Sequence, residues 1–68
     1  MKLSARNSIP GKIEQVHKGA VTTTVRIDIG SGIHITSSIT NEAAEDLALK
    51  AGDSVTAIIK SSDVIIGK

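Results

Sequence analysis

The amino-acid sequence predicts a single, mostly β domain in which five strands form a small barrel and one short helix lies between the third and fourth strands. Apolar and polar residues alternate along most of the chain, which is the pattern of half-buried strands. Glycine-containing turns separate these runs, and one short segment shows helical spacing instead. A length of 68 residues fits one domain, spanning 1–68.

Two adjacent alternating runs give the clearest strand signals. Residues 21–29 place Val, Thr, Val, Ile and Ile at every second position, with mostly polar residues between them. A Gly-Ser-Gly turn follows at residues 30–32, and residues 33–39 resume the alternation. This order predicts an antiparallel hairpin with a short glycine-containing loop.

Three further strands are expected toward the two ends of the chain. Residues 7–16 form the first, with an interruption at Pro10 and Gly11, because proline has no N–H for a ladder and marks an edge, a bend or a bulge. Residues 54–60 and 63–67 form the last two strands, separated by two serines.

One segment breaks the strand rhythm and predicts the helix. Thr40 or Asn41 can serve as the N-cap, and Gly52 is expected just past the C-terminus. The expected helical face consists of apolar residues at helical spacing: Ala44, Leu47 and Ala48. A helix between the third and fourth of five strands is the order of an OB-type barrel.

The composition predicts a thin core and therefore an oligomer. Most apolar residues are slim, with eleven Ile, five Val and seven Ala, and the chain has no Phe, Trp or Tyr. No cysteine is available for a disulfide. Small domains of this kind gain stability by burying apolar surface between copies, so we expect a homo-oligomer.

Charge and apolar runs indicate where the chain acts. A formal net charge of +1 gives no reason to expect binding to nucleic acid or to an anionic membrane. The apolar runs are too short to span a bilayer. No apolar stretch follows Met1 to act as a secretory signal, so a cytoplasmic location is expected.

The two ends of the chain carry the first candidate site. Residues 4–7 (Ser-Ala-Arg-Asn) and 60–63 (Lys-Ser-Ser-Asp) combine cations with small hydroxyl side chains. Such a donor-rich set suits a small, multiply charged oxyanion, since each charge-assisted hydrogen bond contributes roughly 1.5–3 kcal/mol. In the expected topology the first strand lies near the strands that follow the helix, so the two ends can meet. The alternative is that Arg6 and Lys60 are ordinary solvated charges.

Two other places are rich in hydrogen-bond donors. One is the turn at Lys18 and Gly19 with the threonine-rich strand that follows, and the other is the hydroxyl cluster at residues 37–40 before the helix. A plain hairpin turn and N-capping by Thr40 are the alternative interpretations. The two histidines are far apart and no Ser/His/Asp set is present, so neither a metal-cation site nor an enzyme is expected.

Several of these segments, taken together, resemble one family over essentially the whole chain. The matching segments are residues 4–7, 11–13, 18–23, 39–43 and 55–65. They closely resemble the molbindins, the small single-domain members of the Mop family of molybdate-binding proteins. The resemblance implies an OB-like barrel assembled into a hexamer, as a trimer of dimers. It also implies that molybdate or tungstate is held at subunit interfaces as a cytoplasmic store.

The resemblance also implies which residues hold the oxyanion. One half of the main pocket would come from the two chain ends: Ser4, Ala5, Arg6, Lys60, Ser61 and Ser62. Thr40 would be contributed by a neighbouring subunit. A second site, near a symmetry axis, would involve Gly19, Ala20, Val21, Thr22 and Ser38. No cofactor is implied besides the molybdate or tungstate ligand.

A pocket made of donors favours an unprotonated dianion. Phosphate is partly protonated at neutral pH and requires an acceptor for its P–OH group, whereas molybdate and tungstate do not. We therefore expect Asp63 to point away from the pocket, toward backbone N–H groups of its own turn. The alternatives are a structural oligomerisation module and an OB-type nucleic-acid-binding domain, the latter disfavoured because it relies on aromatic stacking and a basic groove.

Overall fold

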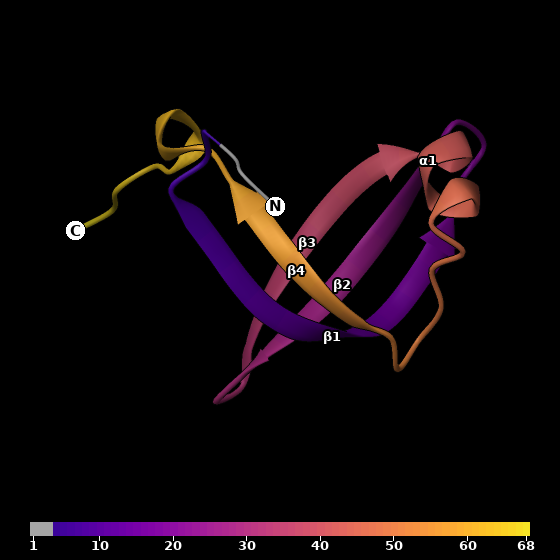
Figure 1. Cartoon of the computed structure of the whole chain (residues 1–68), viewed down its shortest axis with the longest axis horizontal. Helices are drawn as coiled ribbons and strands as arrows, with labels where there is room; N and C mark the ends of the chain where they lie inside the picture. Colours follow the sequence, from indigo (N-terminus) through magenta and orange to yellow (C-terminus); the bar gives the residue numbers. More distant parts are fainter. Residues whose placement is uncertain (1–3) are drawn as a thin grey trace.

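The computed structural model describes residues 4–68 and shows one curled antiparallel sheet with a short helix at one end (Figure 1). The elements in chain order are β1 (Asn7–Lys18), β2 (Thr22–Gly30), β3 (Ile33–Thr40), α1 (Asn41–Asp46), β4 (Ser54–Ile59) and a 3-10 turn (Ser61–Asp63). The sheet order is β3-β2-β1-β4, so β1 and β2 are the central strands. Among the described residues, no helix has the length and apolar character needed to cross a bilayer.

The hairpin of β2 and β3 confirms the strongest sequence prediction. Ile27 lies opposite Ile35 and Thr23 lies opposite Ile39, so the alternating faces of the two strands match. The turn at residues 30–32 has positive φ throughout, at 98°, 55° and 75°. Glycine at the first and third of these positions adopts such angles without a Cβ clash, which explains the Gly-Ser-Gly sequence.

Strand β1 is longer than predicted and continues through Pro10 and Gly11. Pro10 pairs with Thr56 of β4, whereas the pairing with β2 begins only at Lys12. The first part of β1 is therefore an edge on its other side, where the missing proline N–H removes no ladder bond. The irregularity lies between Ile13 and Gln15 instead. The extra residue at that bulge places two successive exposed side chains on β1.

Gly11 lies where β1 bends close over β2. A Cβ built on Gly11 would stand 2.7 Å from the backbone oxygen of Asp28 and 2.7 Å from Cγ2 of Ile27. Real Cβ atoms do not approach other heavy atoms this closely. The glycine thus permits the tight curl of the sheet, a role that no local pattern beyond the neighbouring proline indicates.

The helix begins as predicted but ends early. Thr40 is the N-cap, and its Oγ1 accepts a hydrogen bond from the Ala43 N–H at 3.0 Å. The helix ends at Asp46, and Ala48 takes the left-handed conformation expected for Gly52, with φ of 50°. The predicted buried face is wrong in part, because Leu47 is 67% exposed. Gly52 serves a later turn, in which its N–H donates to the Ile13 carbonyl at 2.8 Å.

Replacing Ala48 with glycine is expected to stabilise the protein. An alanine in the left-handed region carries a steric penalty that glycine avoids, so the net gain is up to about 1 kcal/mol after the entropy of glycine is counted. For a domain of this size this corresponds to roughly 4–8 °C in melting temperature. The matched control is Ala44→Gly inside α1, which should lower the melting temperature. A lower melting temperature for Ala48→Gly as well would contradict the assigned helix end.

The core is small and lies on one face of the sheet. Its buried members are Ile13, Val25, Ile27 and Ala57, together with the almost fully buried Thr23. Around them the curled sheet forms an open, largely apolar groove of about 780 Å³. The thin core that the composition predicted is therefore present, and much apolar surface stays uncovered within one chain.

The predicted fifth strand at residues 63–67 is absent from the described part of the chain. The 3-10 turn after β4 leads the chain away from the sheet, and Figure 1 shows the C-terminal segment extending outward. Ile65 is 93% exposed and Ile66 is 84% exposed. The prediction of a strand at residues 63–67 is therefore wrong, because no edge of the described sheet receives this apolar segment. Four strands thus form a curled, open sheet.

Candidate functional site

The two donor-rich ends of the chain meet within one subunit. Strands β1 and β4 are antiparallel, with Asn7 opposite Ile59 at the end of the ladder. The Asn7 side chain reinforces this pairing, because its Nδ2 donates to the Ile59 carbonyl at 3.1 Å. Arg6 and Lys60 are the next residues outward from this pair, so the ladder places the two cations at the same end of the sheet.

The side chains of this end are available to a ligand. Ala5 is half-buried, and the other candidate residues are exposed: Ser4, Arg6, Lys60, Ser61 and Ser62. The Lys60 carbonyl accepts the Asp63 N–H at 2.9 Å, which closes the turn that carries the two serines. Within residues 4–68, no hydrogen bond or ion pair occupies the Arg6 guanidinium or the Lys60 amine.

The prediction for Asp63 is not confirmed. Its backbone N–H takes part in the turn, but the described residues provide no hydrogen-bond donor to its carboxylate. The side chain is exposed beside the serines rather than bound to backbone N–H groups. The Asp63 and Val64 N–H groups donate to the Lys60 and Ser61 carbonyls instead, at 2.9 and 3.3 Å.

The remaining candidate residues gather at the opposite end of the sheet. Thr40 lies opposite Thr22, and Ser38 lies opposite Thr24, in the pairing of β3 with β2. The turn at residues 19–22 joins the same end of β2 to β1. Figure 1 shows α1 at this end, and the 3-10 turn with the C-terminal segment at the other. Thr40 therefore does not join Arg6 and Lys60 within one chain.

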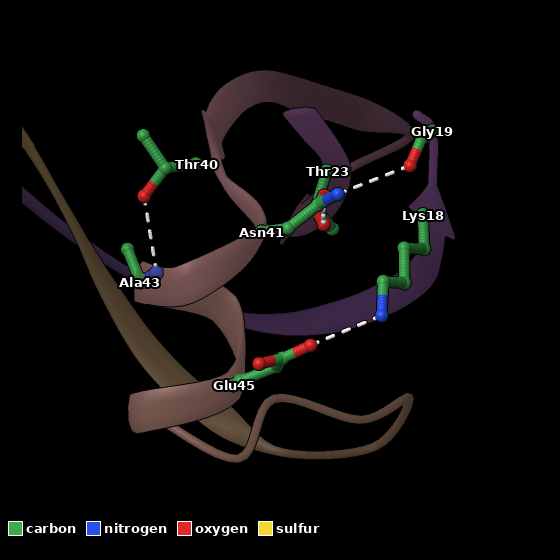
Figure 2. Close-up of polar contacts among 7 residues, drawn as sticks. All are labelled: Lys18, Gly19, Thr23, Thr40, Asn41, Ala43 and Glu45. Atoms are coloured by element: carbon green, nitrogen blue, oxygen red, sulfur yellow. Dashed lines mark hydrogen bonds and ion pairs between the residues drawn. The ribbon is translucent and has the colours of Figure 1, made fainter. Parts of the chain in front are cut away.

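Asn41 organises this second end and was considered in the sequence only as a possible cap. Figure 2 shows its side chain between the β1–β2 turn and β2. Its Oδ1 accepts from Thr23 Oγ1 at 2.7 Å, and its Nδ2 donates to the Gly19 carbonyl at 3.1 Å. The sequence signal for this contact was Thr23, which lies among apolar residues on the buried face of β2. A buried hydroxyl requires a hydrogen-bond partner.

Other charged side chains form ion pairs, one near α1 and two on the surface of the sheet. Lys18 Nζ lies 3.0 Å from Glu45 Oε1, a solvent-exposed pair that links β1 to α1 (Figure 2). On the face opposite the core, Glu14 Oε2 lies 3.2 Å from Arg26 Nε and 2.9 Å from His34 Nε2. These contacts connect β1, β2 and β3. The three charged or polar side chains therefore have a structural role on the surface of the sheet.

Comparison with known proteins gives a consistent family. The TOBE domain model matches residues 3–66. Molybdenum-pterin-binding protein 3 of Clostridium pasteurianum is 47% identical over 66 residues, covering 97% of each chain. Among solved structures, MopII of C. pasteurianum superposes with a TM-score of 0.91 at 42% identity, covering 98% of this chain and 100% of that one. The cytoplasmic molybdate-binding protein ModG gives 0.90 at 43% identity, covering 96% of this chain and 46% of that chain.

The similarity spans the whole described sheet, including both donor-rich ends and the helix between β3 and β4. The chain belongs to the Mop family of small proteins built on a TOBE domain.

Proposed function

We propose that the protein binds molybdate or tungstate at interfaces between copies of the chain and acts as a cytoplasmic store of the oxyanion. The observation that carries the proposal is the β1–β4 pairing, which places Arg6 and Lys60 together with their hydroxyl neighbours. The names of the relatives support the ligand, since they refer to molybdenum-pterin binding, and the solved ModG structure is described with molybdate bound.

The main pocket would combine the two ends of different chains. One copy contributes Ser4, Ala5, Arg6, Lys60, Ser61 and Ser62, and a neighbouring copy contributes Thr40. The separation of these groups within one chain supports a divided pocket. Thr40 suits the role because its Oγ1 already accepts the Ala43 N–H, which leaves its own O–H free to donate to an anion.

A second oxyanion site would lie at the turn and the adjacent strand, with Gly19, Ala20, Val21, Thr22 and Ser38. The pairing of β2 with β3 brings the Ser38 and Thr22 positions to the same end as the turn. This supports a contiguous surface of backbone and hydroxyl donors there.

Assembly follows from the apolar surface that one chain leaves open. The C-terminal segment exposes Val64, Ile65 and Ile66, and the groove along the core face is uncovered. Both features favour a homo-oligomer, for which we propose a hexamer arranged as a trimer of dimers. Association would bury this surface and bring the two kinds of donor-rich end together.

Equilibrium dialysis against molybdate, tungstate, sulfate and phosphate tests the proposed ligand, with native mass spectrometry to count subunits and bound anions. Molybdate and tungstate should bind better than phosphate, because both are unprotonated dianions that an all-donor pocket accepts. Sulfate carries the same charge without a proton, so its weaker binding is expected from its smaller size alone. Preferential binding of phosphate would overturn the ligand assignment. Assembly without binding of any of the four anions would instead identify a structural oligomerisation module.

Molybdate is also expected to raise the melting temperature of the protein. A ligand that binds only the folded oligomer stabilises it by about 2.7 kcal/mol at a hundredfold excess over Kd. For a domain of this size the shift amounts to roughly 10 °C or more. A thermal-shift series over molybdate concentration measures the effect. An unchanged melting temperature at saturating molybdate would contradict the proposal.

A further inference from the structure

The hydrogen bonds of Asn41 tie together three parts of the structure at the α1 end. The Asn41 amide spans from Thr23 Oγ1, in β2, to the Gly19 carbonyl, in the β1–β2 turn. Its backbone N–H donates to the Val21 carbonyl at 3.3 Å. Thr23 is only 1% exposed, so its hydroxyl is fixed by the surrounding core and fixes the amide in turn.

These contacts occupy three carbonyl acceptors of the turn. The Gly19 and Val21 carbonyls accept from Asn41, and the Thr22 carbonyl accepts the Gly19 N–H at 2.8 Å. A carbonyl oxygen that already accepts a hydrogen bond, and is turned toward its donor, is a weaker source of repulsion for an approaching anion. Three carbonyls of the turn are therefore already engaged with donors of the chain itself.

Asn41 is also the residue that directly follows the helix cap. The Thr40 hydroxyl accepts a hydrogen bond from the Ala43 N–H, and the side chain of the next residue, Asn41, donates to the Gly19 carbonyl in the turn (Figure 2). A change in the Asn41 orientation would move the Thr40 hydroxyl relative to the turn. The amide has both its oxygen and its nitrogen satisfied, so a carboxylate or an aliphatic side chain would not replace it.

We propose that Asn41 and Thr23 are positioning residues for oxyanion binding. The pair holds the turn at residues 19–22 and the Thr40 hydroxyl in the geometry that presents donors to the anion. This inference rests on the proposed function, because it assigns a role to residues that do not themselves touch the ligand.

The matched variants Thr23→Val and Thr23→Ser separate positioning from packing. Valine keeps the shape of threonine but removes the hydroxyl, whereas serine keeps the hydroxyl and leaves a methyl-sized gap in the core. Both variants should melt at lower temperature. We expect Thr23→Val to weaken molybdate binding about fivefold and Thr23→Ser to stay within about twofold of the wild type. Equal losses of affinity in the two variants would overturn the inference.

A double-mutant cycle tests whether the two residues act as a unit. Asn41→Ala should weaken molybdate binding at least as much as Thr23→Val, because it releases both the turn and β2. The double variant should then bind no more weakly than Asn41→Ala alone. Additive losses of affinity would show that the two side chains act independently and would contradict the proposed pair.

Amide hydrogen exchange without molybdate keeps this test independent of the ligand. Thr23→Val and Asn41→Ala should speed the exchange of the Gly19 N–H, which closes the turn onto Thr22, whereas Thr23→Ser should preserve its protection. Unchanged Gly19 exchange in both of the first two variants would overturn the positioning role. If the wild-type protein bound none of the oxyanions, the proposed function would fail, whereas the exchange measurement would still show whether Asn41 and Thr23 hold the turn.

Discussion

Replacing Arg6 with alanine is expected to weaken molybdate binding by about 10- to 100-fold, and replacing Lys60 should have a similar effect. Each side chain supplies a charge-assisted hydrogen bond worth roughly 1.5–3 kcal/mol to a dianion. The β1–β4 ladder holds the two positions together at the end of the sheet, so neither cation can compensate fully for loss of the other. Isothermal titration with molybdate measures the change directly.

The control for this experiment is Lys50→Ala. Lys50 is an exposed cation in the connection between α1 and β4, and its amine has no hydrogen-bond partner among residues 4–68. The Lys50→Ala substitution removes one positive charge, as the other two substitutions do, but lies outside the proposed pocket. The molybdate affinity of this variant should therefore match that of the wild type. Retention of full affinity in both Arg6→Ala and Lys60→Ala would remove the chain ends from the site. An equal loss in Lys50→Ala would indicate a general effect of charge.

Replacing Gly11 with alanine is expected to destabilise the protein by about 1–3 kcal/mol, the range for overpacking a close contact. The added Cβ would meet a backbone oxygen of β2 at 2.7 Å, and backbone cannot rotate aside as a side chain can. Relief of the clash would require β1 to move away from β2, which opens the curl of the sheet. The melting temperature should fall by roughly 4–8 °C for each kcal/mol.

Gly67→Ala is the matched control, since a Cβ at that position meets no other atom within 4 Å. It introduces the same methyl group and should leave the melting temperature nearly unchanged. Thermal unfolding at one fixed protein concentration compares the two variants, because an oligomer changes its apparent stability with concentration. A melting temperature of Gly11→Ala equal to that of the wild type would show that the sheet relaxes without strain.

The sequence predicted those features that depend on local pattern. Alternation and Gly-Ser-Gly gave the β2–β3 hairpin, and the hydroxyl before a helical segment gave the Thr40 cap. The helix end was misplaced because Ala48 accepts a left-handed conformation that local preference assigns to glycine. The strand at residues 63–67 was misassigned because a short run of β-branched residues favours a strand without indicating which element it would pair with.

The candidate site was predictable to the extent that topology determines it. Antiparallel pairing of the first and last long strands was enough to bring the ends with Arg6 and Lys60 together. The Thr23–Asn41 contact was missed because it joins a strand to a helix across a turn, so no local pattern contains both residues. Its single sequence signal was a hydroxyl at a position in β2 where every second residue around it is apolar.

The placement of the two kinds of donor at opposite ends of the curled sheet has a consequence for how the anion would be released. A pocket divided between neighbouring chains exists only while the chains are associated, so its affinity depends on the concentration of the protein itself. In the proposed assembly, dilution would separate the half-sites and release the anion without any change in the chain. Conversely, a rise in free anion favours association, so uptake and assembly would reinforce each other.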